Sequence, residues 1–196
     1  MWSYLKSFHH DERGSLSVEM ALVAPMLVWT YLAMFVFFDA YRTKANATKA
    51  TYTFSDLLSR ELDYVNPTYM MSMQQLFNFM TESPNTARIR LTMVRFDEGN
   101  NQYRVNWSKE RGGVGVLNTT SLAQIHNQLP VMPDGEVVIL FESWLDFMPS
   151  FNVGLEPFTI YNHVVTRPRF APQVCWEQPG NLSNNWGGDD APVVDC

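Results

Sequence analysis

The feature that most constrains this chain is an uncharged, largely apolar run from Met20 to Phe38. As a helix that rises about 1.5 Å per residue, the run spans roughly 28 Å, close to the hydrocarbon thickness of a bilayer. It has no polar stripe of the kind that a helix on a soluble domain shows. Glu19 precedes the run and Asp39 follows it. We therefore predict one membrane-spanning helix over residues 15–39.

A cleaved secretory signal is an alternative explanation of the same run. Ala45-Asn46-Ala47 has the small residues of a cleavage site, and cleavage after Ala47 would release a soluble periplasmic domain. However, the run is longer than the usual apolar region of a signal, and Arg42 and Lys44 separate it from that site. We therefore expect an uncleaved anchor, although the basic residues on its two sides do not decide its orientation.

The composition excludes several classes of function. Charged residues make up 17% of the chain, below the roughly 25% of an average soluble protein, which fits a partly membrane-embedded chain. The formal net charge of -6 disfavours nucleic acid as a partner. The sequence has no Gly-x-Ser-x-Gly, His-Glu-x-x-His or phosphate-binding-loop motif. We therefore expect no enzyme, and no metal, cofactor or small-molecule substrate.

The residues from Asp11 to Pro25 form a distinctive string, Asp-Glu-Arg-Gly-Ser-Leu-Ser-Val-Glu-Met-Ala-Leu-Val-Ala-Pro. A charged leader, a glycine, a carboxylate five residues later and a membrane helix resemble the processing region of prepilins. The whole string resembles the opening of TadE-like proteins, minor-pilin-like components of the bacterial tight-adherence, or Flp, pilus machinery. The positions that match the family pattern are Arg13, Gly14, Val18, Glu19 and Pro25.

This resemblance implies a processing site. A prepilin peptidase would cut between Gly14 and Ser15, so that Glu19 becomes the fifth residue of the mature chain. A carboxylate at the edge of hydrocarbon is costly unless it is paired. The freed amino terminus of a neighbouring subunit would pair with Glu19 and hold the two helices in register.

The resemblance also implies lateral docking in the membrane. The small residues Ala21 and Ala24, with Pro25, would let the helix pack on other helices. The implied partners are the membrane, the pilus assembly platform, other pilin-like subunits and the prepilin peptidase.

The sequence beyond the anchor predicts that the helix continues. No proline or glycine occurs from Ala40 to Tyr64, and apolar residues recur at three- and four-residue spacing. These residues are Ala47, Ala50, Phe54, Leu57, Leu58 and Leu62. We therefore expect one helix over residues 17–64, roughly 70 Å long, with two helices broken near Asp39 as the alternative.

Further elements follow the long helix. Asn66-Pro67 starts a predicted helix that ends at Ser83-Pro84. Alternating side chains predict strands over 87–93 and 103–107, with a hairpin loop at 97–101. Two further strands are predicted over 136–144 and 158–167, with Pro149 and Pro157 bracketing their connection, and a short helix over 122–129. Pro168 indicates that the last strand lies at a sheet edge. Arg88 and Arg90 line one face of the first strand, which is solvated by default or meets an acidic partner.

The tail, residues 170–196, is expected to be irregular. It carries Cys175 and Cys196, and if this part is periplasmic, a disulfide between them is the natural pairing. In the cytoplasm both thiols would stay free, so the disulfide is also a prediction of orientation.

Together these observations predict an α+β fold, with a long N-terminal helix packed on a small antiparallel sheet, as in pilins. We expect a single-pass protein of the bacterial inner membrane whose C-terminal part lies in the periplasm. Residues 1–14 would be a cytoplasmic leader, 15–39 the membrane helix, 40–169 a periplasmic α+β domain and 170–196 the disulfide-tied tail. The resemblance implies a minor pilin or pseudopilin-like protein for assembly of a Tad/Flp pilus. The alternative is a signal-anchored periplasmic module of another secretion or envelope complex.

Overall fold

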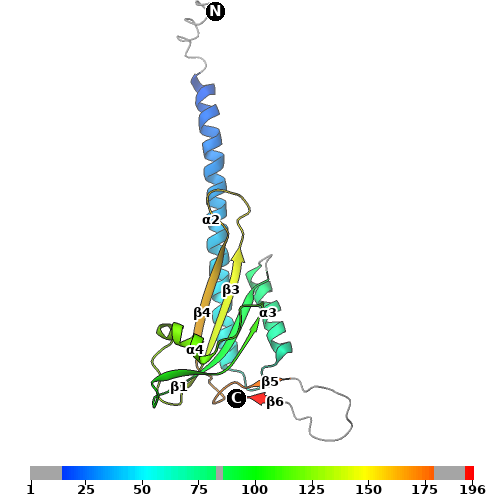
Figure 1. Cartoon of the computed structure of the whole chain (residues 1–196). Coiled ribbons are helices and arrows are strands. Elements are labelled where there is room, and N and C mark those ends of the chain that lie inside the picture. Colours follow the sequence, from blue (N-terminus) through cyan, green and yellow to red (C-terminus); the bar gives the residue numbers. More distant parts are fainter. Residues whose placement is uncertain (1–14, 83–85, 179–192) are drawn as a thin grey trace, which may run out of the picture. The chain divides into compact units, whose positions relative to one another are not determined.

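The structure is a computed structural model, and it describes residues 15–82, 86–178 and 193–196 (Figure 1). These residues have an α+β fold, as the sequence predicts, in two compact units. The first unit holds the chain up to Tyr41 and the loop Pro149–Glu156, and the second holds Arg42–Met148 and Pro157–Cys196. The division thus falls two residues after the expected end of the membrane helix at residue 39. The loop, which the sequence assigns to the 40–169 domain, groups with the first unit instead.

Helix α2 runs without a break from Ser15 to Ser59, so the alternative of two helices broken near Asp39 is wrong. Its second half packs on the sheet through a narrow stripe of buried residues. These are Ala47, Ala50, Thr51, Phe54, Ser55, Leu58 and Ser59. The small side chains in the stripe let the helix come close to the sheet, where the hydroxyls of Thr51 and Ser143 hydrogen-bond at 2.8 Å.

The helix ends at Ser59, five residues before the predicted end at residue 64. The next two backbone N–H groups bond to the carbonyls three residues earlier, at 3.1 and 3.2 Å, which tightens the last turn. The N–H of Arg169 donates to the carbonyl of Ser59 at 2.7 Å. Leu57 lies off the buried stripe of α2 and Leu62 lies past the end of the helix. These two residues, which the spacing assigns to the buried face, are 40% and 70% exposed.

Four antiparallel strands form the sheet, in the order β2-β1-β3-β4. Their bounds are Arg88–Asp97 for β1, Gln102–Arg111 for β2, Val137–Phe147 for β3 and Phe158–Thr166 for β4. All four predicted strands are confirmed, and β4 lies at an edge, as Pro168 indicates. The turn between β1 and β2 has its positive φ at Asn101, 46°, rather than at the glycine of this loop.

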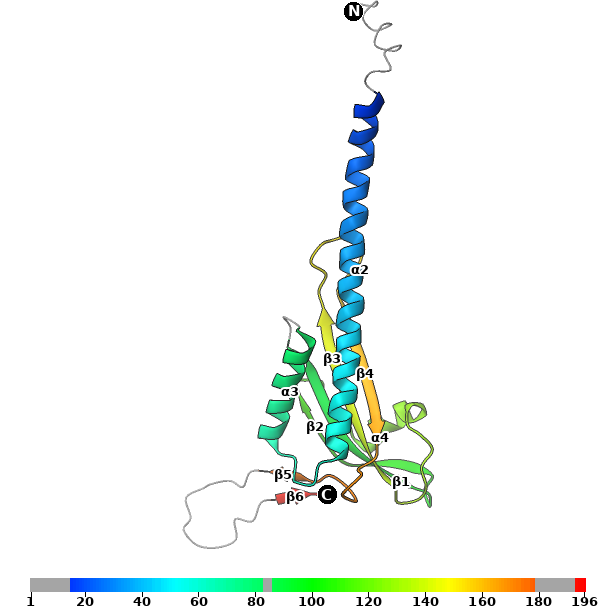
Figure 2. The same ribbon diagram turned by 180° about the vertical axis from the view of Figure 1, so that it is seen from behind.

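Helix α3, Pro67–Thr81, lies beside α2 on the same face of the sheet (Figure 2). Asn66 caps it as predicted, because its side-chain oxygen accepts the N–H of Tyr69 at 2.9 Å. In the core between these helices and the sheet, Phe54 of α2 contacts both α3 and β3. Its ring lies 5.7 Å from that of Phe77 of α3 and 6.0 Å from that of Phe141 of β3, measured between centroids.

The opposite face of the sheet, which we call the outer face, is covered at one end by two short helices. These are α4, Thr119–Leu122, and the 3-10 helix η2, Ala123–Gln128. The apolar cluster beneath them contains Val94, Leu117, Leu122, Leu129, Met132, Val138 and Leu140. The rest of the outer face carries charged and aromatic side chains of β1, β3 and β4.

The tail, expected to be irregular, contains a short antiparallel pair of strands. Their bounds are Trp176–Gln178 for β5 and Val193–Asp195 for β6. Cys175 and Cys196 are joined by a disulfide next to this pair. The N–H of Val65 donates to the carbonyl of Cys175, and the N–H of Glu177 donates to the carbonyl of Val65, both at 2.9 Å. The tail is thereby fastened to the link between α2 and α3.

Candidate functional site

The first candidate site is the apolar half of α2, in the first unit. Every residue from Leu16 to Tyr31 is exposed, and only 6% of the most apolar stretch of the helix is buried. Large apolar side chains point outward around the helix, among them those of Leu22, Met26, Leu27, Trp29 and Phe38. A core helix of a soluble domain would bury most of them. By length and composition, α2 is the one helix in the described part of the chain that could cross a membrane.

The predicted processing and register residues fall at the start of this helix. Gly14 lies outside the described residues, and Ser15 is the first residue of α2. Glu19 lies about one turn further along and is exposed. It is thus accessible to a partner from another chain at the point where the apolar run begins.

The small residues Ala21, Ala24 and Pro25 lie on one side of α2, and Glu19 lies on the other. Successive residues of an α-helix are rotated by about 100°, so positions three or four apart share a side, whereas Glu19 and Ala21 differ by roughly 200°. The helix therefore does not bring the predicted register and docking residues together. Pro25 lies inside the helix and has no N–H to donate to the carbonyl of Ala21.

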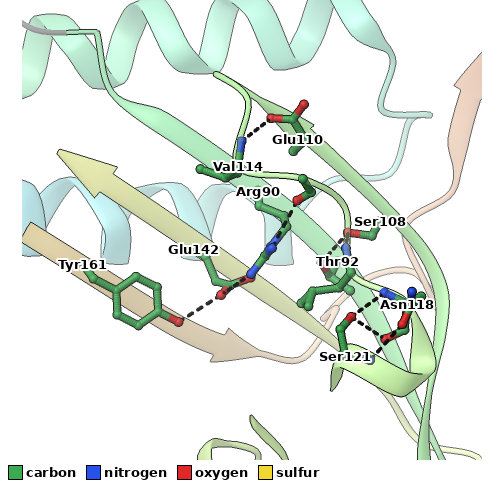
Figure 3. Close-up of polar contacts among 11 residues, drawn as sticks. Arg90, Thr92, Ser108, Glu110, Val114, Asn118, Ser121, Glu142 and Tyr161 are labelled. Atoms are coloured by element: carbon green, nitrogen blue, oxygen red, sulfur yellow. Dashed lines mark hydrogen bonds and ion pairs between the residues drawn. The ribbon is translucent and has the colours of Figure 1, made fainter. Parts of the chain in front are cut away.

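The second candidate site is a buried ion pair on the outer face of the sheet (Figure 3). Arg90 of β1 lies directly opposite Glu142 of β3. Its Nε and Nη2 atoms donate to the two carboxylate oxygens at 2.7 and 2.8 Å, and the hydroxyl of Tyr161 donates to one of them at 2.9 Å. The side chain of Glu142 is 1% exposed and that of Arg90 is 11% exposed. The guanidinium also lies 4.9 Å from the ring centroid of Trp144 and donates to the carbonyl of Gly115 at 3.1 Å.

This pair corrects the expectation that the arginine face of β1 is solvated. Arg90 meets Glu142, and Arg88 meets Asp146 at 2.7 Å, so the acidic partner is the chain itself. The partners are 52 and 58 residues apart, and the sequence does not give the register that joins them. The sequence does contain one sign of the ion pair, which is the single glutamate in the middle of the apolar strand Val137–Phe147. A carboxylate that such a strand buries needs a compensating cation.

The chemistry of this site is that of a structural pair. Both carboxylate oxygens of Glu142 are already engaged. Burial, and then the negative charge of Glu142, raise the pKa of Tyr161 above its ordinary value, so its phenol stays protonated and continues to donate. Tyr69 behaves in the same way, because burial and its hydrogen bond to Glu61, 2.9 Å long, raise its pKa. Both tyrosines therefore act as hydrogen-bond donors at neutral pH.

The surface of the described part of the second unit has hollows, of which two lie beside the sheet. One has a volume of about 360 Å³ and lies against the rings of Phe96 and Tyr103. The other has a volume of about 410 Å³ and lies against Tyr52 of α2 and Val164 of β4. Within residues 15–82, 86–178 and 193–196, no group of three or more His, Cys, Asp or Glu side chains could hold a metal ion.

The disulfide bears on the location of the second unit. Disulfides form and persist in oxidising compartments and are rare in the cytoplasm. The bond between Cys175 and Cys196 therefore indicates that this unit is extracytoplasmic.

Comparisons of the chain with protein-family models, with curated proteins and with solved structures find no match.

Proposed function

We propose that this chain is a TadE-like minor pilin or pseudopilin-like protein that takes part in the assembly of a Tad/Flp pilus. The observation that carries the proposal is the position of Arg13, Gly14 and Glu19 at the start of an apolar helix whose residues from Leu16 to Tyr31 are all exposed. Such a helix needs lipid or other helices around it. Its unbroken continuation as far as Ser59 supports a subunit in which one helix serves both the anchor and the folded unit.

We further infer that the protein is a single-pass protein of the bacterial inner membrane with its second unit in the periplasm. The length and exposure of the apolar half of α2 support the anchor. The disulfide between Cys175 and Cys196 supports the periplasmic side for the unit that contains it. The leader, residues 1–14, would then remain in the cytoplasm, where a prepilin peptidase removes it.

The proposed role is assembly and involves no catalysis by this chain. Glu19 would pair with the amino terminus of a neighbouring pilin-like subunit, while Ala21 and Ala24 dock on another helix of the assembly platform. Because these residues lie on opposite sides of α2, the two contacts involve different neighbours. Two such contacts would make the chain a subunit of an assembly, whereas a simple tether needs neither.

The first experiment determines the N-terminus of the native protein isolated from membranes, by intact mass and terminal sequencing. The proposal predicts a chain that begins at Ser15. A chain that begins at Met1 would indicate an uncleaved anchor and a static assembly factor. A chain that begins at Thr48 would contradict every interpretation in which α2 is retained in the membrane.

The second experiment replaces Glu19 by alanine and measures surface pili by electron microscopy and immunoblotting. The proposal predicts loss of pili with a normal amount of protein in the membrane, because the helix still inserts but lacks its register contact. Glu98→Ala is the matched control, since Glu98 is an exposed glutamate of the hairpin loop. If both variants leave pilus assembly unchanged, the chain is better described as a signal-anchored module of another envelope complex.

A further inference from the structure

The loop between β3 and β4, Pro149–Glu156, contacts the apolar helix. It belongs to the same compact unit as the chain up to Tyr41, and it runs alongside α2 in both ribbon views (Figures 1 and 2). The ring of Phe151 meets that of Phe35 edge to face, with centroids 6.4 Å apart. The two rings remain 46% and 49% exposed, so neither is sealed inside the protein.

The position of Phe35 shows where along the apolar run the loop contacts α2. Phe35 lies three residues before Phe38, the last residue of the apolar run, which is about 4.5 Å along the helix axis. A bilayer that covers the run as far as Phe38 therefore also surrounds Phe35. The ring of Phe151 then lies at the boundary between hydrocarbon and headgroups.

The composition of the loop fits that boundary. No charged residue occurs between Asp146 and Glu156, in a stretch that reads Phe-Met-Pro-Ser-Phe-Asn-Val-Gly-Leu. Placing an uncharged loop with an exposed phenylalanine at a membrane surface removes apolar area from water without burying an ion. A charge in the same place would have to leave its hydration shell.

We propose that this loop is a second membrane contact, inserted into the bilayer interface at the Phe38 end of the apolar run, with Phe151 as its anchor. The partner is the lipid surface itself. The inference rests on the proposed membrane role of α2 and adds to it: the loop would set how far the apolar run enters the bilayer. The observation that favours lipid as the partner is the ring contact between Phe151 and Phe35, because Phe35 is an exposed residue of the apolar run.

The experiment measures the depth of single labels in the full chain reconstituted in lipid nanodiscs. Both cysteines of the chain are in the disulfide, so an introduced cysteine is the single reactive thiol. Nitroxide labels are placed at Phe151→Cys, at Leu27→Cys in the apolar run, and at Phe79→Cys. Phe79 of α3 is 79% exposed and is the matched control for an exposed phenylalanine outside the loop.

Collisions with oxygen, which concentrates in lipid, are compared with collisions with a water-soluble nickel chelate. We expect the ratio of oxygen to nickel collisions to be several-fold higher at 151 and at 27 than at 79. A high ratio at 27 with an aqueous ratio at 151 overturns the loop contact and leaves the anchor intact. An aqueous ratio at 27 overturns the anchor, and the loop contact with it.

A second label keeps the phenylalanine in place. A nitroxide at Ser150→Cys, an exposed position beside Phe151, should also report lipid. Adding Phe151→Asp should shift the label at 150 to the aqueous ratio, while adding Phe151→Leu should leave it in lipid. If Phe151→Asp leaves the ratio at 150 unchanged, Phe151 is not the anchor and the proposal is wrong.

Discussion

Replacing Glu142 by glutamine tests how strongly the second unit depends on its buried ion pair. The carboxylate of Glu142 accepts from Arg90 at 2.7 and 2.8 Å and from the hydroxyl of Tyr161 at 2.9 Å. Glutamine has almost the same size, but its amide has one oxygen in place of two and no charge. The guanidinium of Arg90, 11% exposed, then loses the carboxylate with which it pairs, and Glu110, opposite Arg90 on β2, is the acidic residue that remains beside it in the sheet.

The contacts of Arg90 set the expected magnitude. Breaking a buried pair by removing one partner costs about 3–5 kcal/mol, chiefly because a charge remains buried without compensation. Arg90 keeps its bond to the carbonyl of Gly115 and its contact with the ring of Trp144, so we expect the lower end of that range. A loss of about 3 kcal/mol corresponds to a melting temperature lower by roughly 6–12 °C in a domain of this size.

The assay is thermal and urea unfolding of the full chain in detergent micelles, followed by near-ultraviolet circular dichroism. Glu82→Gln is the control, because Glu82 pairs with Arg42 at the surface, with side chains 67% and 56% exposed, and should change stability by less than about 1 kcal/mol. The double variant Arg90→Met/Glu142→Leu should be more stable than Glu142→Gln, since it leaves no buried charge. A Glu142→Gln variant as stable as the Glu82→Gln control would refute the reasoning.

Three further predictions concern the second unit. Replacing Cys175 and Cys196 together by serine should lower the free energy of unfolding by about 3 kcal/mol, because the bond closes a loop with a sequence separation of 21; urea unfolding that matches the wild type would contradict this. Burial and Glu142 raise the pKa of Tyr161 above its ordinary value of 10.0. As the pH rises above 10, the unfolded chain therefore releases the phenol proton while the folded chain keeps it, and the free energy of unfolding falls. Tyr161→Phe should reduce this fall. Unfolding midpoints measured from pH 8 to 11 check the slope, and parallel curves for wild type and variant would count against it. Asn66→Ala should cost about 1 kcal/mol and Asn66→Gly a few tenths, since Asn66 caps α3; equal losses would show that the cap is not the cause.

The long helix and the strands were predictable because each depends on local sequence. The stretch from Ala40 onward has no proline or glycine to end α2 near Asp39, and period-two alternation identifies β1 and β2, whereas β3 is a nearly continuous apolar run. The end of α2 was not predictable from local sequence, because the carbonyl of its last residue, Ser59, accepts from Arg169, which is 110 residues later in the chain. The pair β5 and β6 was missed for a related reason: each strand has three residues, too few to show a period.

The candidate sites divide in the same way. The apolar run of α2 is visible in the sequence, because a membrane segment is defined by composition and length. The pair of Arg90 and Glu142 is not, since it requires the register between β1 and β3. The contact of Phe151 with Phe35 is not visible either, because the two positions are 116 residues apart. The one feature of the local sequence that points to it is the lack of charged residues in the loop.

The position of Glu142 in the sheet also limits how β1 and β3 can mispair. A slip of one residue would turn its carboxylate toward the core that holds Phe54 and Phe141. A slip of two would keep it on the outer face but set Arg90 opposite Leu140 or Trp144, so the carboxylate would again be buried without its cation. An apolar pair at these positions would tolerate such shifted sheets far better. The double variant Arg90→Met/Glu142→Leu should therefore regain stability while losing some of the uniqueness of strand pairing, seen as extra amide signals for β3.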